Sequence, residues 1–184
     1  MSTSERTAVV IAIGAAALAA CASLPPAPGK PPAFGAMVSA EEVARWDISI
    51  PPSGAGLPAG SGTAKQGAAV YSAKCLACHG EKGAGKPADA LVGGIGSLAT
   101  ARPVRTVGSY WPYATTLFDY TRRAMPITNP LSLTDDEVYA VSAYVLFLNG
   151  IVGEDAVMNA QTLPQVKMPN RDGFVSDWPP RARN

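Results

Sequence analysis

The sequence predicts one all-α domain with long loops, flanked by less regular segments. Three stretches with helix caps or helical spacing lie between residues 63 and 150, and no stretch alternates polar and apolar residues with a period of two. Glycine and proline are abundant, at 18 and 17 of 184 residues. We divide the chain into a leader at 1–21, an arm at 22–62, a domain at 63–150 and a tail at 151–184.

The first two helices of the domain are predicted from their ends. Thr63 can cap a helix that runs to about Lys74. A second helix begins near Pro112, because proline is tolerated in a first turn, and runs to about Ala124.

The third helix has the clearest pattern in the chain. Thr134 and Glu137 form a capping box, and Gly150 stands where a helix C-terminus is expected. The apolar stripe between them consists of Val138, Val141, Val145 and Leu148.

The arm and the tail are poor in periodic pattern. Proline, glycine and alanine in the arm favour an extended chain, interrupted by a capping box at Ser39–Glu42 that predicts a short helix ending near Trp46. In the tail we expect a single helical turn at Glu154–Met158.

The first residues are typical of an export signal that directs the chain to the periplasm. Ala8–Ala20 is an uninterrupted run of small and apolar residues, shorter than the roughly 20 residues that span a bilayer. Leu18–Cys21 is similar to a bacterial lipobox, which would make Cys21 a lipid-anchored N-terminus. Ordinary cleavage after Ala20 or Ala22, or an uncleaved anchor, are the alternatives.

Charge argues against one class of partner. The formal net charge is +1, and no basic tract is present, so we expect no nucleic-acid binding.

The chemistry is concentrated in Cys75–His79, which reads C-L-A-C-H. Two thiols three residues apart on a helical turn can form thioethers to the two vinyl groups of one haem, and the adjacent His79 can then reach the iron. The motif therefore predicts one covalently attached haem c.

Two other uses of the motif are less consistent with the rest of the chain. A zinc site needs four ligands, yet outside the motif the chain has only Cys21 and no other histidine. A redox dithiol of the thioredoxin type needs a βαβ context, and the sequence shows no strands.

The second axial ligand follows from composition. His79 is the only histidine, so a methionine is the expected partner. Met125, which lies between two helices and is stiffened by Pro126, is the first choice, and Met168, also followed by proline, is its rival. The methionines of the chain are Met1, Met37, Met125, Met158 and Met168.

The residues around the motif resemble class I cytochromes c. Gly67 and Tyr71 stand eight and four residues before Cys75, as in that family, and Tyr144 is the expected aromatic counterpart on the last helix. The resemblance implies a class I cytochrome c fold, with Gly67 allowing two helices to approach closely. It also implies that Pro87 offers its carbonyl to the haem histidine.

A narrower resemblance covers most of residues 38–178. It is to the cytochrome subunits of bacterial sulfite and sulfane dehydrogenases, the SorB/SoxD type, and it implies a molybdopterin-containing dehydrogenase subunit as electron donor. The chain has one C-x-x-C-H, whereas some sulfane-dehydrogenase cytochromes carry two haems. The strings that carry the resemblance are W-D-I at 46–48, G-S-G-T-A at 60–64, T-V-G-S-Y-W-P-Y-A-T-T-L-F-D-Y at 106–120, R-R-A-M-P at 122–126, S-L-T-D-D-E-V-Y-A at 132–140 and K-M-P-N-R-D-G-F at 167–174.

Other residues are candidates for the haem surroundings. Arg105 and Trp111 are of types that donate hydrogen bonds to propionates, and core or surface packing is their alternative role. Arg122 and Arg123 fall in the last turn of a helix, where cations suit the dipole, and one of them is a candidate for docking an acidic partner.

Three functions fit these features. The first is the electron-accepting subunit of a molybdenum sulfur dehydrogenase that passes electrons to a downstream cytochrome or oxidase. The second is a free-standing, periplasmic or lipid-anchored electron shuttle. The third, a haem enzyme acting on sulfur, needs an open iron position, which two axial ligands would not leave.

Overall fold

The computed structural model describes residues 34–175. It consists of two compact units, Met1–Trp46 and Asp47–Asn184. None of the helices among the described residues has the length and apolar character needed to cross a membrane. The predicted leader at 1–21, with Cys21, lies outside the described residues.

The described part of the first unit contains one short helix, α2 (Ala40–Trp46). The backbone N–H of Glu42 donates to the hydroxyl of Ser39 at 3.1 Å, which confirms the helix start predicted there. All seven helical residues are exposed.

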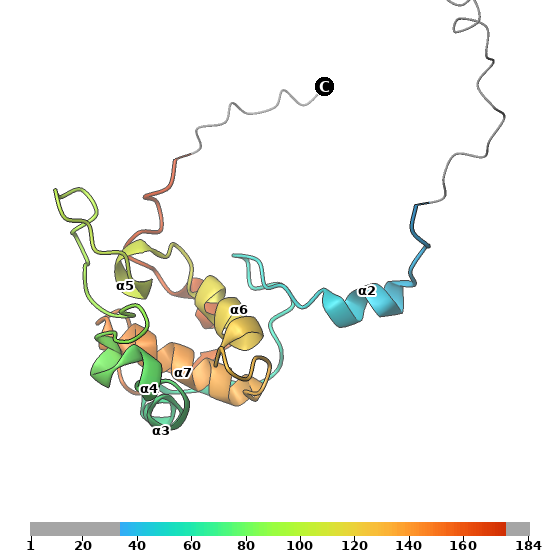
Figure 1. Ribbon diagram of the computed structural model, residues 1–184, viewed down its shortest axis with the longest axis horizontal. Coiled ribbons are helices and arrows are strands. Elements are labelled where there is room, and N and C mark those ends of the chain that lie inside the picture. Colours follow the sequence, from blue (N-terminus) through green and yellow to red (C-terminus); the bar gives the residue numbers. More distant parts are fainter. Residues whose placement is uncertain (1–33, 176–184) are drawn as a thin grey trace, which may run out of the picture. The chain divides into compact units, whose positions relative to one another are not determined.

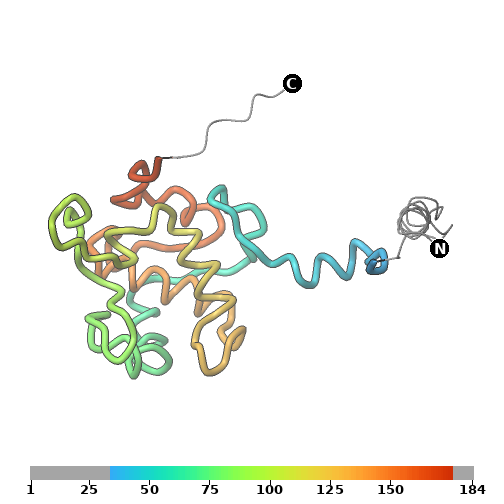
Figure 2. Tube along the Cα trace, turned by 45° about the horizontal axis from the view of Figure 1, so that its top comes forward, coloured from blue at the N-terminus to red at the C-terminus, as the bar shows by residue number. Residues whose placement is uncertain are grey.

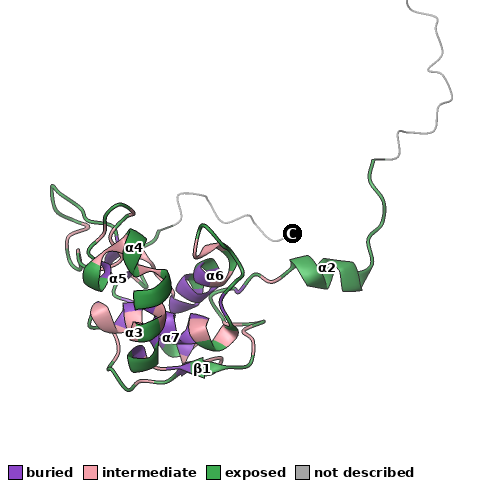
Figure 3. Ribbon diagram, turned by 60° about the horizontal axis from the view of Figure 1, so that its bottom comes forward, coloured by how far each residue is buried: buried purple, intermediate pink, exposed green. Residues whose placement is uncertain are grey.

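The second unit is built around α7 (Asp135–Leu148), which is labelled in Figure 1 and is largely purple, that is buried, in Figure 3. Its N-cap is Thr134, and both bonds of the predicted capping box with Glu137 are present. The helices α3 (Ala64–Lys74) and α6 (Ala114–Ala124) both pack against α7. The unit is therefore helical around one central helix, as the sequence predicts.

Two helix starts differ in detail from expectation. The helix α6 begins at Ala114 rather than near Pro112, and its end at Ala124 is as predicted. The helix α5 (Val107–Tyr110) was not predicted. Its cap is a box between Thr106 and Ser109, and serine at that position is a weaker sequence signal than the usual glutamate or glutamine.

Segments far apart in the sequence close the unit. The strands β1 (Ser61–Gly62) and β2 (Met158–Asn159) pair antiparallel, with Ser61 opposite Asn159 and Gly62 opposite Met158. In Figure 2 the segment before β1 runs beside the orange and red C-terminal segment, which also forms the short 3-10 helix η2 (Leu163–Gln165).

The C-terminal segment contributes to the core instead of lying outside it. Four of its side chains, Met158, Leu163, Val166 and Met168, are at most 9% exposed and belong to the hydrophobic core. Ile50, from the predicted arm, is 6% exposed and belongs to the same core. Residues from the predicted arm and from the described part of the tail thus share one core with the domain predicted at 63–150.

The helical turn predicted at Glu154–Met158 is wrong. Glu154 and Asp155 form a turn, and the chain then enters β2. The hydroxyl of Thr162 donates to the carbonyl of Val157 at 2.7 Å, so this segment is held by a side chain and not by helical bonds.

Candidate haem-attachment site

The C-L-A-C-H motif lies where one helix ends and another begins. The N–H of Cys75 donates to the carbonyl of Tyr71 at 2.9 Å and so closes α3, and Cys75 is also the N-cap of α4 (Leu76–His79). The N–H of His79 donates to the carbonyl of Cys75 at 2.9 Å. Cys75, Cys78 and His79 thus share one helical turn, and both thiols are free.

The imidazole of His79 has a defined tautomer. Its Nδ1 lies 3.0 Å from the backbone oxygen of Asp89. A carbonyl oxygen can only accept a hydrogen bond, so Nδ1 carries the proton and Nε2 keeps its lone pair. Neutral imidazole with a free Nε2 is the form that binds iron.

The acceptor is Asp89, and the expectation that Pro87 supplies this carbonyl is wrong. The loop after His79 closes on itself, because the N–H of Gly85 donates to the carbonyl of His79 at 2.7 Å and the N–H of Ala88 donates to the carbonyl of Cys78 at 2.9 Å. This closure brings the residue after Ala88 opposite the ring. No side-chain pattern in the sequence marks Asp89, because it acts through its backbone.

Tyr71 fixes the loop from the other side. Its hydroxyl donates to the carbonyl of Gly80 at 2.8 Å, and burial is the main cause of a raised pKa for this phenol. Gly80 has φ +71°, and a β-carbon there would lie 2.3 Å from the oxygen of Gly85. The turn directly after His79 therefore requires glycine.

The thiols do not resemble a redox dithiol or a zinc site. Burial raises the pKa of Cys75 to about 11, whereas a reactive dithiol needs a lowered pKa. Within residues 34–175 no three His, Cys, Asp or Glu side chains are grouped so that they could hold a metal ion. The two alternatives weighed for the motif thus gain no support.

The described methionines fall into different environments. Met158 and Met168 are 4% and 3% exposed and belong to the hydrophobic core. Met37 is fully exposed, in the first unit. Met125 is half-buried and is the C-cap of α6, with an extended backbone at φ −118° and ψ 144°.

The two predicted propionate contacts flank α5. Arg105 is exposed, and its guanidinium carbon lies 5.4 Å from the centre of the Tyr110 ring. Trp111 is half-buried and packs edge-on against Tyr120, with ring centres 5.7 Å apart. Neither arrangement uses the guanidinium N–H groups or the indole N–H of these residues in a hydrogen bond within the described chain.

Both arginines before Met125 form ion pairs within the chain. Arg122 Nε lies 3.2 Å from Asp135 Oδ1, and Arg123 forms a bidentate pair with Asp119 at 3.0 and 2.5 Å. Docking of an acidic partner by one of them stays a prediction.

Asn149 is a structural residue that sequence reasoning missed. Its Oδ1 accepts from the N–H of Gly93 at 3.2 Å, and its Nδ2 donates to the carbonyls of Leu91 at 3.1 Å and Val145 at 2.9 Å. It is 9% exposed and ties the loop at 91–93 to the end of α7. The only signal in the sequence is its place just before Gly150, where a C-cap is expected.

The donor set fits a c-type haem. Two free thiols and an imidazole with an available Nε2 share one turn, and a half-buried thioether is supplied by the end of α6. Several large apolar side chains of α4 and of the loops before α5 and after α6 are exposed; these are Leu76, Ile95, Val104, Ile127 and Leu131.

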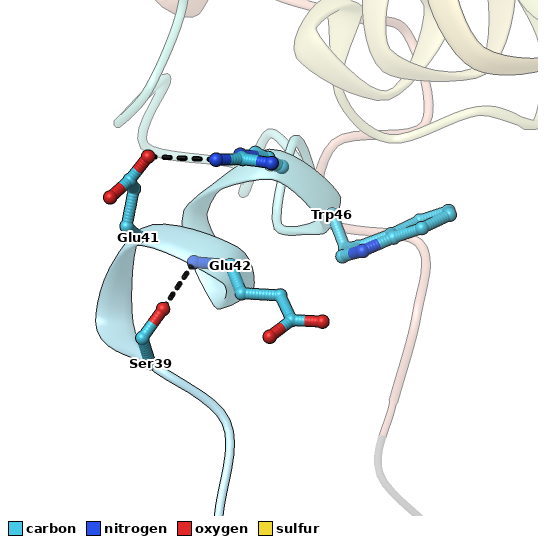
Figure 4. Close-up of a pocket in the computed structure, with 5 residues that line it drawn as sticks. Ser39, Glu41, Glu42 and Trp46 are labelled. Atoms are coloured by element: carbon cyan, nitrogen blue, oxygen red, sulfur yellow. Dashed lines mark hydrogen bonds and ion pairs between the residues drawn. The ribbon is translucent and has the colours of Figure 1, made fainter.

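A separate shallow pocket lies on α2 and is shown in Figure 4. Its lining contains the ion pair of Glu41 with Arg45, at 2.7 Å, and the 82% exposed Trp46. It contains no thiol, imidazole or thioether, so it does not fit a haem.

Comparison with known proteins bears on the family to which the chain belongs. A family profile described as cytochrome c oxidase, cbb3-type, subunit III matches residues 62–145. A search of curated proteins finds no match. Among solved structures, a chain in the crystal structure of the sulfane dehydrogenase SoxCD from Paracoccus pantotrophus is similar, with 40% sequence identity and a TM-score of 0.73. The match covers 80% of this chain and 73% of that chain.

Proposed function

Because the chain belongs to the class I cytochrome c family, we propose that it binds one haem c covalently and transfers single electrons in the oxidation of sulfur compounds. When bound, the haem supplies an iron that alternates between Fe(II) and Fe(III). The protein supplies the attachment, the axial ligands and the surroundings.

The attachment is assigned to Cys75 and Cys78, and the first axial ligand to His79. The hydrogen bond from Nδ1 to the carbonyl of Asp89 is the observation that carries this assignment. It orients the ring, fixes the tautomer and makes Nε2 a better donor to iron. A histidine that only filled space would not need this hydrogen bond, which orients the ring on the same helical turn as two free thiols.

Met125 is assigned as the second axial ligand. Met168, the rival candidate, and Met158 are buried in the hydrophobic core, where their thioethers fill space between apolar side chains. Met125 is half-buried at a helix end, so its side chain is not committed to the core. If His79 and Met125 both held the haem iron, no coordination position would be left for a substrate, and the chain would conduct electrons without catalysis of its own.

Arg105 and Trp111 are assigned to the propionates. Both residues flank α5. The N-cap of this helix, Thr106, is held in place because its hydroxyl donates to the carbonyl of Gly93 at 2.6 Å. Guanidinium and indole N–H groups that are not otherwise engaged are suitable donors to carboxylates.

The proposed electron donor is a molybdopterin-containing dehydrogenase subunit, and the acceptor is a downstream cytochrome or oxidase. The support is the 40% identity to a chain of sulfane dehydrogenase SoxCD over most of both chains. Under this proposal the protein works in the periplasm.

Covalent attachment is tested on protein from a host that matures c-type cytochromes. We expect the red colour to stay with the polypeptide in acid acetone, and the pyridine haemochrome spectrum to report one haem per chain. Cys78→Ala should lose one thioether and most of the holoprotein yield. The matched control is Ser72→Ala, an exposed change in the same region. Colour released by acid acetone from the unmodified protein would overturn the proposal.

The axial assignment is tested with two volume-conserving variants. Met125→Leu should abolish the weak long-wavelength band that reports an iron–thioether bond and should lower the midpoint potential. Met168→Leu should keep both. The reverse pattern would make Met168 the ligand.

The partner is tested by isolating the tagged chain from its native host. A stoichiometric second subunit that contains molybdenum is expected. A chain that elutes alone, with full haem content and no molybdenum, would indicate the free-standing shuttle.

A further inference from the structure

The segment that carries Met125 is poorly supported by its own contacts. Residues 125–134 connect α6 to α7. Before the N-cap Thr134, the backbone bonds that hold this segment are Met125 N–H to Thr121 O at 3.1 Å and Asn129 N–H to Pro126 O at 2.9 Å. Ile127 and Leu131 are 72% and 62% exposed. Of its large apolar side chains, only Leu133 reaches the core. The position of the Met125 thioether therefore depends on how the two ends of the segment are held.

An ion pair connects the two ends of the segment. Arg122 is in the last turn of α6, and Asp135 is the first residue of α7. Their side chains meet at 3.2 Å and are 24% and 37% exposed. This pair joins the two helices directly and spans the whole segment that contains Met125.

A second contact fixes the last turn of α6. Asp119 is 8% exposed and accepts three hydrogen bonds, two from Arg123 and one from the N–H of Ile50 at 3.0 Å. Ile50 is itself a core residue, so the carboxylate ties this turn to a distant and rigid part of the unit. Charge-assisted and bidentate bonds of this kind set geometry as well as energy.

We propose that Asp135 and Asp119 are positioning residues for Met125: each holds one of the two arginines before it, and together they keep the thioether on the iron. This inference rests on the proposed function. Each arginine forms an ion pair within the chain. The two adjacent cations at the end of α6 therefore have partners in addition to the helix dipole.

The test measures how easily Met125 leaves the iron. Imidazole added to the ferric holoprotein competes with the thioether, so its apparent affinity reports the detached fraction. Asp135→Asn should tighten apparent imidazole binding about two- to fivefold, the range for a partly exposed ion pair. Asp119→Asn should tighten it about tenfold or more, because the pair with Arg123 loses its buried negative charge and one of its two acceptor oxygens.

Two sets of controls separate positioning from general destabilisation. Arg45→Gln removes an ion pair, at 2.7 Å to Glu41, that lies within α2 of the first unit, and it should leave the imidazole affinity unchanged. Arg122→Gln, Asp135→Asn and the double variant should have the same effect, because each breaks the same pair. Asp135→Glu restores the carboxylate and should return the affinity close to that of the unmodified protein.

The outcomes distinguish this inference from the proposed function. If Met125→Leu keeps the long-wavelength band, the axial assignment fails. If that band depends on Met125 but Asp135→Asn and Asp119→Asn both bind imidazole as the unmodified protein does, the positioning role fails alone. Additive effects of Arg122→Gln and Asp135→Asn would also overturn it.

Discussion

Gly67 touches the backbone of α7: a β-carbon built on it would lie 1.9 Å from the carbonyl oxygen of Ala140 and 2.8 Å from Cβ of Tyr144. The neighbouring Tyr71 then packs on Tyr144, with ring centres 5.3 Å apart. This crossing of α3 and α7 is the one implied by the class I resemblance, and here it is confirmed. It places the helix that leads into the C-L-A-C-H turn.

The first prediction concerns this crossing. Gly67→Ala forces the two helices apart, because the contact is with backbone and no side chain can turn away. We expect a loss of at least about 3 kcal/mol in the free energy of unfolding, measured by urea titration, together with reduced holoprotein yield. Ala69→Ser, an exposed change two residues further along α3, should unfold at the same urea concentration as the unmodified protein. A Gly67→Ala variant with an unchanged midpoint would contradict the close approach.

The second prediction concerns the latch at Asn149. Asn149→Ala removes the acceptor for the N–H of Gly93 and the donor to the carbonyl of Leu91. We expect a loss of about 2–4 kcal/mol in the free energy of unfolding and faster hydrogen exchange at the amide of Gly93. Asn149→Asp keeps the acceptor but not the donors, so it should protect that amide without restoring full stability. Equal exchange rates in all three proteins would argue against the latch.

The third prediction concerns acid stability. Hydrogen bonding from the N–H of Thr134, followed by that from Lys74, holds the pKa of Glu137 below its usual value of 4.5. A lowered folded pKa means that the stabilisation is present above that value and is lost as the pH falls through the lower, folded value. Glu137→Gln keeps an amide that can complete the capping box but removes the charge. Its stability relative to the unmodified protein should therefore rise as the pH falls below about 4.5.

The measurement is urea unfolding at pH 7 and at pH 3 to 4. The control is Glu154→Gln, an exposed carboxylate in the tail. If Glu137→Gln and Glu154→Gln show the same acid dependence, then Glu137 is not the group responsible.

The fourth prediction concerns alkaline stability. Burial raises the pKa of Tyr139 to about 12, and its hydroxyl donates to the carbonyl of Pro58 at 2.9 Å. A raised folded pKa means that the stabilisation is complete below the ordinary value of 10.0 and is lost as the pH rises from there to about 12. Tyr139→Phe should lose about 1 kcal/mol at pH 8, and this deficit should shrink above pH 10.

Chemical unfolding at pH 8, 10 and 11 checks this, with Tyr120→Phe as the control because that ring is 46% exposed. A deficit that stays constant over this pH range would show that the Tyr139 hydroxyl does not titrate differently in the folded state.

The sequence alone predicts those features that depend on residues close together in the chain. Thr63 and Thr134 carry complete capping boxes, and the helices begin directly after them. The turn at Cys75–His79 and the pairing of Tyr71 with Tyr144 are equally local or follow from the resemblance.

Features that depend on long-range contact were not predictable in this way. Asp89 holds His79 through a backbone carbonyl, which any residue possesses. The carboxylate of Asp119 accepts a hydrogen bond from the N–H of Ile50, 69 positions away in sequence. The residues around these two positions carry no pattern that predicts the contact. Leu163 and Val166 lie in a segment without helical or strand periodicity, yet they are buried because the strand pair β1–β2 brings that segment back to the core.

That return has a consequence for the order of events during biogenesis. A ribosome delivers the two cysteines and the histidine about eighty residues before Met158, Leu163 and Met168. Until those last residues arrive, the interior lacks part of its filling and β1 has no partner strand. Docking of the last segment therefore completes the core and pairs β1, so folding of the second unit depends on residues far along the chain from the C-L-A-C-H turn.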